Sequence, residues 1–424
     1  MTTLSRRDVL KSATPALTAW MLAPVRPARL LPRFAVLSPQ GQAPRANVLV
    51  CVFLRGGMDG LNTVIPHGDP NYYDLRPSLG IPEPTNGDDS AIDLDGFFSL
   101  HPSLRPLKDV WDDDCLAVVH ATGSPDPSHS HFDAMDYMER GTPGEKQIPT
   151  GWLARHLELA AWQNGSPFRA VGFGTLLPSS LRGPIPSIAL KSIADFHLGG
   201  RRQSPELEQF QAALMEMYAN GSSLDDNAAF TMDAISMLES AASGEYVPSN
   251  NAVYPESEFG ESLKQTAQLI KAEIGLEVAA VDLGGWDTHN AQGQLDGQMP
   301  ALLADLGASL SAFYQDMGES MKNITVVTMS EFGRRAAENA SAGTDHGHGN
   351  LMLLMGKSLN GGRVYGQWPG LAPEQLASPG DLAITTDFRS VLGELLQKHL
   401  LDPQVEQVFP NFSNYQPLGF AKEL

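Results

Sequence analysis

The stretch ANVLVCVFLRGG, residues 46–57, decides the fold class. It is an almost unbroken apolar run that ends in two glycines. Such a run is typical of a strand that is buried on both faces, as in a parallel sheet covered by helices. Comparable runs occupy 116–123, 275–285, 323–333 and 350–356. Stretches with helical patterns lie between them, at 130–141, 204–219, 229–242, 262–272 and 299–317.

This alternation predicts a doubly wound α/β fold, with a mostly parallel sheet and helices on both faces. With 424 residues, 42% of them hydrophobic, the chain is long enough for one large packed domain. We assign residues 46–424 to that domain. The segment from about 200 to 270 is rich in helix and poor in strand, which predicts a helical insertion or cap over the sheet.

The N-terminal segment has a different character. Paired arginines stand in SRRDVLK, residues 5–11, before the mildly apolar run at 12–25. That run is too short and too polar to cross a bilayer. Residues 1–45 therefore resemble a twin-arginine export signal with a linker, cleaved between about 28 and 46. This predicts the twin-arginine export machinery as a partner, a periplasmic or secreted location, and no stable transmembrane anchor. The alternative is a basic, disordered N-terminal arm.

The charge balance excludes some partners. Residues 1–45 hold seven Lys or Arg and one acid, Asp8, which leaves 22 basic and 48 acidic residues and a net charge of −26 in the remainder. A body this acidic repels nucleic acid and anionic membrane surfaces. An anionic substrate would need a strong local positive centre, such as a metal ion.

The two cysteines, Cys51 and Cys115, leave two alternatives open. Exported proteins can form disulfides. Two buried free thiols on neighbouring strands fit the apolar surroundings equally well.

Residues capable of chemistry follow the predicted strands at the points where they end. They are Asp59, Ser130 with His131, Asp287 with His289, Glu331 with Arg334, and Asp345, His346 and His348 in the glycine-rich GTDHGHGN at 343–350. Ligands bind at the carboxyl ends of strands in open α/β sheets. We therefore expect these side chains to meet on one rim of the sheet.

Each residue also has a structural explanation. Asp59 fits a turn or a cap, and Ser130 fits an N-cap. Glu331 could simply pair with a neighbouring arginine, and the histidines of the glycine loop could be solvated. The combination favours function, because five strand ends carry such residues. Five of the 11 histidines lie in these segments, namely His129, His131, His289, His346 and His348.

The chemistry that this set supports is metal-assisted. Histidine nitrogens and carboxylate oxygens suit zinc, manganese or iron, and calcium is a further candidate. A two-metal site about 4 Å across can clamp the attacking and leaving oxygens of phosphoryl or sulfuryl transfer. Ser130, at the start of a helix, is placed as a nucleophile. The chain contains no G-x-S-x-G elbow, no G-x-G-x-x-G after a strand and no P-loop.

Five segments carry a family resemblance. FLRGGMDGLNTVIP, SHFDAMDYMERG, GGWDTHN, SEFGR and TDHGHGN resemble the exported proteins of the domain-of-unknown-function 1501 family. That family is similar to the alkaline phosphatase and sulfatase superfamily. The resemblance extends from about residue 47 to the C-terminus and implies an alkaline phosphatase-like fold.

The resemblance also implies roles. Asp59 is similar to a metal-contacting Asp after the first strand, and Ser130 to the nucleophile, with His131 beside it. Asp287 and His289 resemble the Asp/His pair of one metal, and His346 or His348 the late His ligand. Glu331 stands where phosphatases have an Asp-His pair, but Phe332 follows it. Ser130 lacks the C-x-P-S-R context of formylglycine sulfatases.

Two functions follow. The first is an exported metal-dependent hydrolase of small anionic phosphate or sulfate esters. In it Ser130 attacks, Arg334 stabilises the anion, and Asp59, Asp287, His289, Glu331, Asp345, His346 and His348 supply metal ligands. The alternative is a non-catalytic exported binding or assembly protein that retains the fold. A structural lattice protein, a third possibility, predicts no convergence of these side chains.

Overall fold

The computed structural model describes residues 47–423, except 86, 161–165, 195–229, 232 and 239–244. Its strands are β1 (Val48–Arg55), β2 (Val64–Ile65), β3 (Ile92–Asp93), β4 (Ser99–Leu100), β5 (Leu116–Gly123), β6 (Ala170–Phe173), β7 (Ile188–Leu190), β8 (Val278–Gly284), β9 (Ile324–Met329), β10 (Asn350–Met355), β11 (Arg363–Tyr365) and β12 (Thr386–Asp387).

The labelled α-helices are α3 (Gly60–Thr63), α4 (Asn71–Leu75), α5 (Lys108–Asp112), α6 (His131–Arg140), α7 (Trp152–Leu159), α10 (Glu258–Lys271), α11 (Gln298–Met317), α12 (Phe388–Glu394) and α13 (Val405–Val408). Short 3₁₀ or π segments are η2 (Pro102–Leu107), η3 (Ser179–Leu181), η4 (Gly318–Asn323) and η5 (Leu395–His399).

The main sheet has the strand order β11-β5-β10-β9-β1-β8-β6-β7, and β12 also pairs with β5. β1 lies in the interior and pairs in parallel with β8 and β9. β10 is the antiparallel exception, between β5 and β9. The predicted doubly wound, mostly parallel α/β sheet is confirmed.

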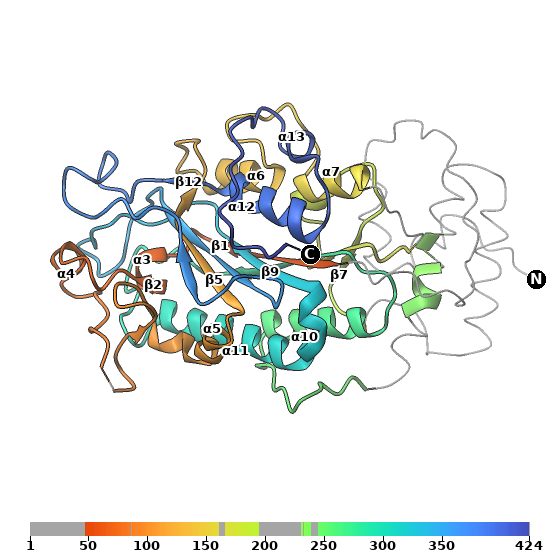
Figure 1. Ribbon diagram of the computed structural model, residues 1–424, viewed down its shortest axis with the longest axis horizontal. Coiled ribbons are helices and arrows are strands. Elements are labelled where there is room, and N and C mark those ends of the chain that lie inside the picture. The colour runs from red at the N-terminus through yellow and green to blue at the C-terminus, as the bar shows by residue number, and fades with distance from the viewer. Residues whose placement is uncertain are drawn as a thin grey trace, which may run out of the picture.

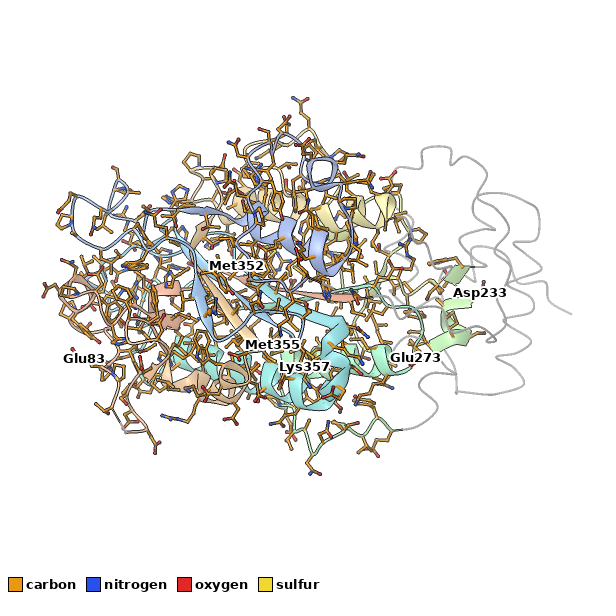
Figure 2. All side chains as sticks on the ribbon, in the orientation of Figure 1. Glu83, Asp233, Glu273, Met352, Met355 and Lys357 are labelled. Carbon is orange, nitrogen blue, oxygen red and sulfur yellow. The ribbon has the colours of Figure 1, made fainter. Side chains whose placement is uncertain are left out.

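Both faces of the sheet are buried, which explains the unbroken apolar run of β1. Val50 belongs to the core cluster that contains Leu306 of α11, whereas Leu49 belongs to the cluster that contains Trp152 of α7. Figure 1 shows α10 and α11 on one side of the sheet and α6, α7, α12 and α13 on the other. Met352 and Met355 of β10, labelled in Figure 2, likewise belong to the two different clusters.

Most of the predicted helical insertion lies outside the described residues, and so does the predicted helix at 204–219. The insertion therefore stays a prediction. The end of that range is α10, which packs beside α11 beneath the sheet (Figure 1). Among the described residues, no helix is both long and apolar enough to cross a membrane.

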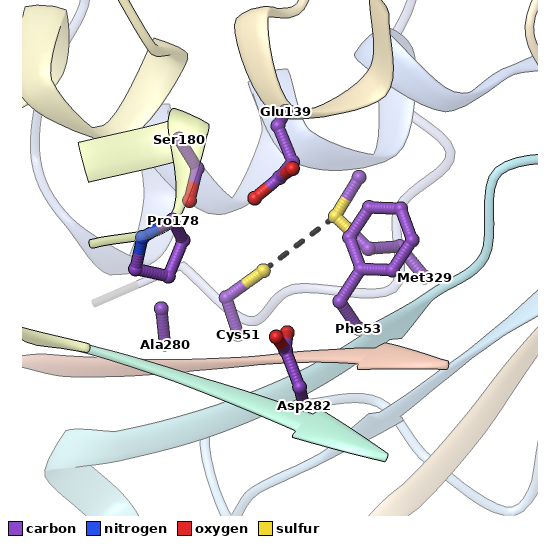
Figure 3. Close-up of a pocket in the computed structure, with 8 residues that line it drawn as sticks. All are labelled: Cys51, Phe53, Glu139, Pro178, Ser180, Ala280, Asp282 and Met329. Atoms are coloured by element: carbon purple, nitrogen blue, oxygen red, sulfur yellow. Dashed lines mark hydrogen bonds between the residues drawn. The ribbon is translucent and has the colours of Figure 1, made fainter. Parts of the chain in front are cut away.

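Both cysteines are free and buried. Cys51 Sγ lies 3.5 Å from Met329 Sδ, in a small pocket that Phe53, Glu139 and Asp282 help to line (Figure 3). Burial raises the pKa of the Cys51 thiol, and the nearby carboxylates add to the effect. The thiol is therefore a protonated core group.

Candidate metal centre

The candidate residues come from loops that meet at one edge of the sheet. β1, β8 and β9 are parallel, and β5 shares their direction because β10 is antiparallel to both β5 and β9. Their carboxyl ends therefore lie at the same edge, where antiparallel β10 begins. The loops before β10 and after the parallel strands meet there, as the sequence predicts.

One carboxylate oxygen gathers three imidazole nitrogens. Asp287 Oδ1 lies 3.1 Å from His289 Nε2, 3.1 Å from His346 Nε2 and 3.4 Å from His131 Nε2. His289 Nε2 and His346 Nε2 are themselves 2.9 Å apart. We call Asp287, His131, His289 and His346 the Asp287 cluster.

The second nitrogen of each ring faces a hydrogen-bond acceptor. His131 Nδ1 lies 2.7 Å from Glu331 Oε1, His289 Nδ1 3.1 Å from Asp345 Oδ1, and His346 Nδ1 3.0 Å from the His129 carbonyl oxygen. These partners assign the ring proton to Nδ1 and leave a lone pair on Nε2. Metal-ligating histidines are usually held in this way.

This donor set fits a divalent metal. Three Nε2 lone pairs and a carboxylate oxygen converge, and two of the nitrogens are so close that their lone pairs repel unless a cation or a proton lies beside them. His131 Nε2 is buried and has no hydrogen-bond partner. One oxygen and three imidazole nitrogens suit zinc, manganese or iron.

The surroundings of Asp287 and His346 favour the protonation states that can bind a metal, an ionised carboxylate and a neutral imidazole. Burial raises the pKa of Asp287, but the hydrogen bond from Arg334 and the charge of that guanidinium outweigh it and bring the pKa down to about 2. Burial, with the Arg334 charge nearby, lowers the pKa of His346. Asp287 is thus an anion and His346 is neutral near pH 7. The hydrogen bond to Glu331 instead raises the pKa of His131.

Glu331 and Asp345 lie behind the histidines and not among the metal-facing atoms. Both oxygens of buried Glu331 are already used. Oε1 accepts from the Gly56 amide at 2.8 Å as well as from His131, and Oε2 accepts from Ser330 Oγ at 3.2 Å. Asp345 also accepts from Asn339 Nδ2 at 3.0 Å. The metal role predicted for both residues stays untested, and their contacts in this structure make them orienting partners of the histidines.

The predicted role of Arg334 in stabilising an anion also stays untested. Its guanidinium is buried and donates to Asp287 Oδ1 at 2.8 Å, to the Thr344 carbonyl oxygen at 2.9 Å and to the Trp286 carbonyl oxygen at 3.0 Å. It donates further to the carbonyl oxygens of residues 56 and 57. Each of the three guanidinium nitrogens therefore already donates to a protein acceptor, and Arg334 positions Asp287.

Asp59 lies apart from the Asp287 cluster. The buried Arg76 guanidinium binds both of its oxygens, at 2.5 and 3.0 Å, and Gln292 Nε2 donates to Oδ2 at 2.7 Å. A carboxylate so fully paired is not free to ligate a metal. The prediction that Asp59 binds metal stays untested, and in this structure Arg76, 17 positions along the chain, pairs with both of its oxygens.

Ser130 is exposed and is the N-cap of α6. Its φ and ψ are −83° and 117°, and its side chain makes no capping hydrogen bond. The hydroxyl is therefore not used by the helix, and Ser130 directly precedes His131 of the Asp287 cluster in the chain. Its other neighbour, His129, belongs to a second group with His348 and Asp381.

His348 therefore lies with His129 and Asp381 and not in the Asp287 cluster, with whose residues the sequence grouped it. One signal could have identified His129, because the alternation in SHSH at 128–131 repeats the alternation of His346 and His348. Asp381 carried no signal, since it stands in an ordinary SPGD turn far along the chain.

Glycines allow the site loops to approach closely. A Cβ on Gly347 would overlap the backbone of Arg334, and one on Gly343 would overlap the backbone of His289. The glycines of 343–350 thus bring the loop against the ends of β8 and β9. The residues on either side of Gly347 then point into the two different groups.

Comparison with known proteins gives a family. The model of the family described as "Protein of unknown function (DUF1501)" matches residues 46–404. No curated protein matches the chain by sequence.

Solved structures of low similarity were also found. The PsFucS1 sulfatase from Pseudoalteromonas sp. has 11% identity and a TM-score of 0.36, over 89% of this chain and 74% of that chain. The C-terminal periplasmic domain of EcEptC from Escherichia coli, in complex with Zn, has 10% identity and a TM-score of 0.34, over 74% of each chain. The alkaline phosphatase from the Antarctic bacterium TAB5 has 10% identity and a TM-score of 0.28, over 76% of this chain and 95% of that chain.

Proposed function

The chain belongs to the DUF1501 family of proteins of unknown function, and from that premise we propose that it is an exported metal-dependent hydrolase of phosphate or sulfate esters. One observation carries the proposal. Three Nε2 atoms converge on Asp287 Oδ1 and each ring is held by an acceptor at Nδ1, while Ser130, whose hydroxyl does not cap α6, directly precedes His131 in the chain.

Asp287, His131, His289 and His346 would hold the metal. A set with three nitrogens favours zinc, then manganese or iron, over calcium, which prefers oxygen ligands. When bound, such an ion supplies Lewis acidity and positive charge for an anionic ester. That local charge counters the acidic body of the chain, which would otherwise repel the substrate.

The chain's own residues have separate tasks. Arg334 keeps Asp287 ionised and fixed, and Glu331 orients His131. Ser130 Oγ attacks phosphorus or sulfur, so that a seryl ester forms while the bond to the leaving alcohol breaks, and the seryl proton ends on that alcohol. Water then cleaves the seryl ester, which restores the hydroxyl and releases phosphate or sulfate.

The test is metal content followed by turnover. Purified wild type should hold zinc, manganese or iron, and His289→Ala should lose the ion from the Asp287 cluster. Ser130→Ala should keep the metal but lose hydrolysis of para-nitrophenyl phosphate, bis-para-nitrophenyl phosphate or para-nitrophenyl sulfate. His67→Ala, outside the cluster, is the matched control and should change neither property.

The outcomes separate the two functions. Metal without turnover on any ester would favour the alternative, a non-catalytic exported binding or assembly protein. Absence of metal from the wild type, even after reconstitution, would contradict the hydrolase. Full activity in Ser130→Ala would remove Ser130 as the nucleophile and leave attack by water.

We propose a periplasmic or secreted location through the twin-arginine machinery. The paired arginines Arg6 and Arg7 support it, as does the change from a basic segment at 1–45 to the acidic body. This route exports folded proteins, which suits a chain that acquires a metal before export.

A further inference from the structure

A second set of ligand-type side chains lies beside the Asp287 cluster. One ligand atom each from His129, His348 and Asp381 lies within 4.8 Å of the others. His129 precedes α6, His348 precedes β10, and Asp381 precedes β12. Three separate loops therefore contribute one side chain each to a common point.

Asp381 is the unusual member. Its side chain is 0% exposed, yet neither carboxylate oxygen has a hydrogen-bond partner. The nearest titratable side chain across the group is His129, whose Nε2 lies 3.5 Å from Asp381 Oδ2 and is also buried without a hydrogen bond. A buried carboxylate with no donors is strongly unfavourable, and such groups are usually paired or bound to a metal.

Arg335 does not satisfy Asp381. The two residues form a backbone bridge, but no ion pair within 4.0 Å joins their side chains in the described part of the chain. The backbone of Asp381 is held separately, because its amide donates to the Ala377 carbonyl oxygen at 2.8 Å. The backbone of Asp381 is thus fixed in place, and no side-chain donor in the described part of the chain satisfies its carboxylate.

His129 and His348 are oriented so that each can offer a ring nitrogen to the position beside the Asp381 carboxylate. His348 Nε2 lies 3.0 Å from the Asp126 carbonyl oxygen, so that nitrogen carries the proton and Nδ1 carries the lone pair. The His129 ring centroid is 5.5 Å from that of His348. The His129 carbonyl oxygen meanwhile accepts from His346 Nδ1, which ties this group to the Asp287 cluster.

We propose that His129, His348 and Asp381 form a second binding site for a divalent transition metal, distinct from the Asp287 cluster. Two imidazoles and one carboxylate are the ligands of zinc, manganese or ferrous iron, and three protein ligands leave open positions for water or substrate. The alternation of His129 with His131, and of His346 with His348, gives each segment one ligand for each site. Ser130 then stands in the chain between a ligand of one site and a ligand of the other.

A shared proton is the competing explanation. Burial raises the pKa of Asp381, although the nearby positive groups oppose this, so a neutral acid could persist without metal. The two explanations differ in the number of ions that the folded chain holds. They also differ in what Asn, which has the shape of the neutral acid, does at position 381.

The experiment counts zinc. Apo protein is loaded with Zn²⁺, passed through a desalting column and analysed by native mass spectrometry and elemental analysis. We expect two ions per wild-type chain, one in Asp381→Asn and one in His289→Ala, which damages the other site. Asp402→Asn is the matched control. Asp402 is also a buried carboxylate, but it pairs with His156 at 2.8 Å, and this variant should keep two ions.

Loading with Co²⁺ adds a spectroscopic readout. The visible absorption of wild type minus that of Asp381→Asn should give the spectrum of the site with two histidines and a carboxylate. His348→Gln serves as the second variant if Asp381→Asn does not fold. Fewer than two ions in the wild type, or an unchanged count in a folded Asp381→Asn or His348→Gln, would overturn the second site. Loss of an ion only in His289→Ala would leave the proposed hydrolase centre standing alone.

Discussion

At the scale of single residues, the Asp287 cluster is organised by groups that do not face its centre. Each imidazole is oriented through Nδ1, and Arg334 holds the carboxylate. Their removal should therefore weaken metal binding without deleting a ligand. Outer partners of this kind typically contribute 10–100-fold to metal affinity.

Glu331→Gln tests this arrangement with almost no change in volume. We expect zinc affinity to fall about 10–100-fold, because His131 loses the carboxylate that orients it. The pKa of His131 should fall as well, since the hydrogen bond to Glu331 is the main cause of its rise. A chelator competition gives the affinity, and the proton NMR titration of His131 in apo protein gives the pKa.

The matched control is Glu338→Gln. Glu338 also accepts hydrogen bonds from a loop, at the amides of Ser78 and Leu79, but it lies outside the Asp287 cluster. This variant should keep the wild-type zinc affinity. Equal losses in both variants would show that the effect comes from general loosening of the fold.

The hydrogen-bond partners of single residues are what the sequence could not predict. Asp59 has the right type and the right strand end, but Arg76 binds both of its oxygens. Arg334 has the right charge, but the backbone carbonyls of neighbouring loops use its donors. Long-range pairing decided both cases, and neither partner is visible in the local pattern.

At the scale of elements, the long strands could be predicted and the short ones could not. β1, β5, β9 and β10 are buried almost throughout and β8 over its first four residues, and burial on both faces leaves a continuous apolar run. β6, β7 and β11 have only three or four residues and no periodicity to detect. Asp381 was missed for the same reason, because its turn has no pattern of its own.

The glycine loop gives a prediction about element packing. Gly347→Ala places a Cβ against the backbone of Arg334, which cannot move aside as a flexible side chain would. We expect a loss of about 1–3 kcal/mol in the free energy of unfolding and lower metal content, because the loop must withdraw. Gly284→Ala is the matched control, since a Cβ there meets no atom within 4 Å. Urea unfolding of the two variants gives the comparison.

Three buried histidines make the packed elements sensitive to acid. Burial lowers the pKa of His101, His120 and His399 to about 4, against 6.5 in the unfolded chain. The unfolded chain then binds more protons between those values, so stability is complete above about pH 6.5 and is lost as the pH falls toward 4. Each histidine should contribute a loss of about 2 kcal/mol at pH 5.

The variant His399→Gln isolates one of these contributions. The difference in unfolding free energy between pH 7 and pH 5 should shrink by about 2 kcal/mol relative to wild type, whatever the variant loses in packing at both pH values. Urea titrations at the two pH values measure it. An unchanged difference would show that His399 is not held neutral in the folded protein.

At the scale of the whole molecule, the sign of charge divides the chain into two parts. Residues 1–45 are basic, whereas the body that begins with β1 at Val48 is strongly acidic. If the first part is an export signal, its removal leaves the sheet intact, because cleavage between about 28 and 46 precedes β1. The same division concentrates any attraction for anionic esters at the metal centre.

Replacing both arginines in Arg6→Lys/Arg7→Lys keeps the positive charge but removes the guanidinium pair that the twin-arginine pathway recognises. We expect the unprocessed chain to accumulate in the cytoplasm, whereas wild type should appear outside it with a new N-terminus between about 28 and 46. Cell fractionation and N-terminal sequencing measure both properties. Arg26→Lys/Arg29→Lys is the control with equal charge and should be exported normally. If all three chains stayed in the cytoplasm uncleaved, the basic segment would be an N-terminal arm, and the ester substrate would have to be sought inside the cell.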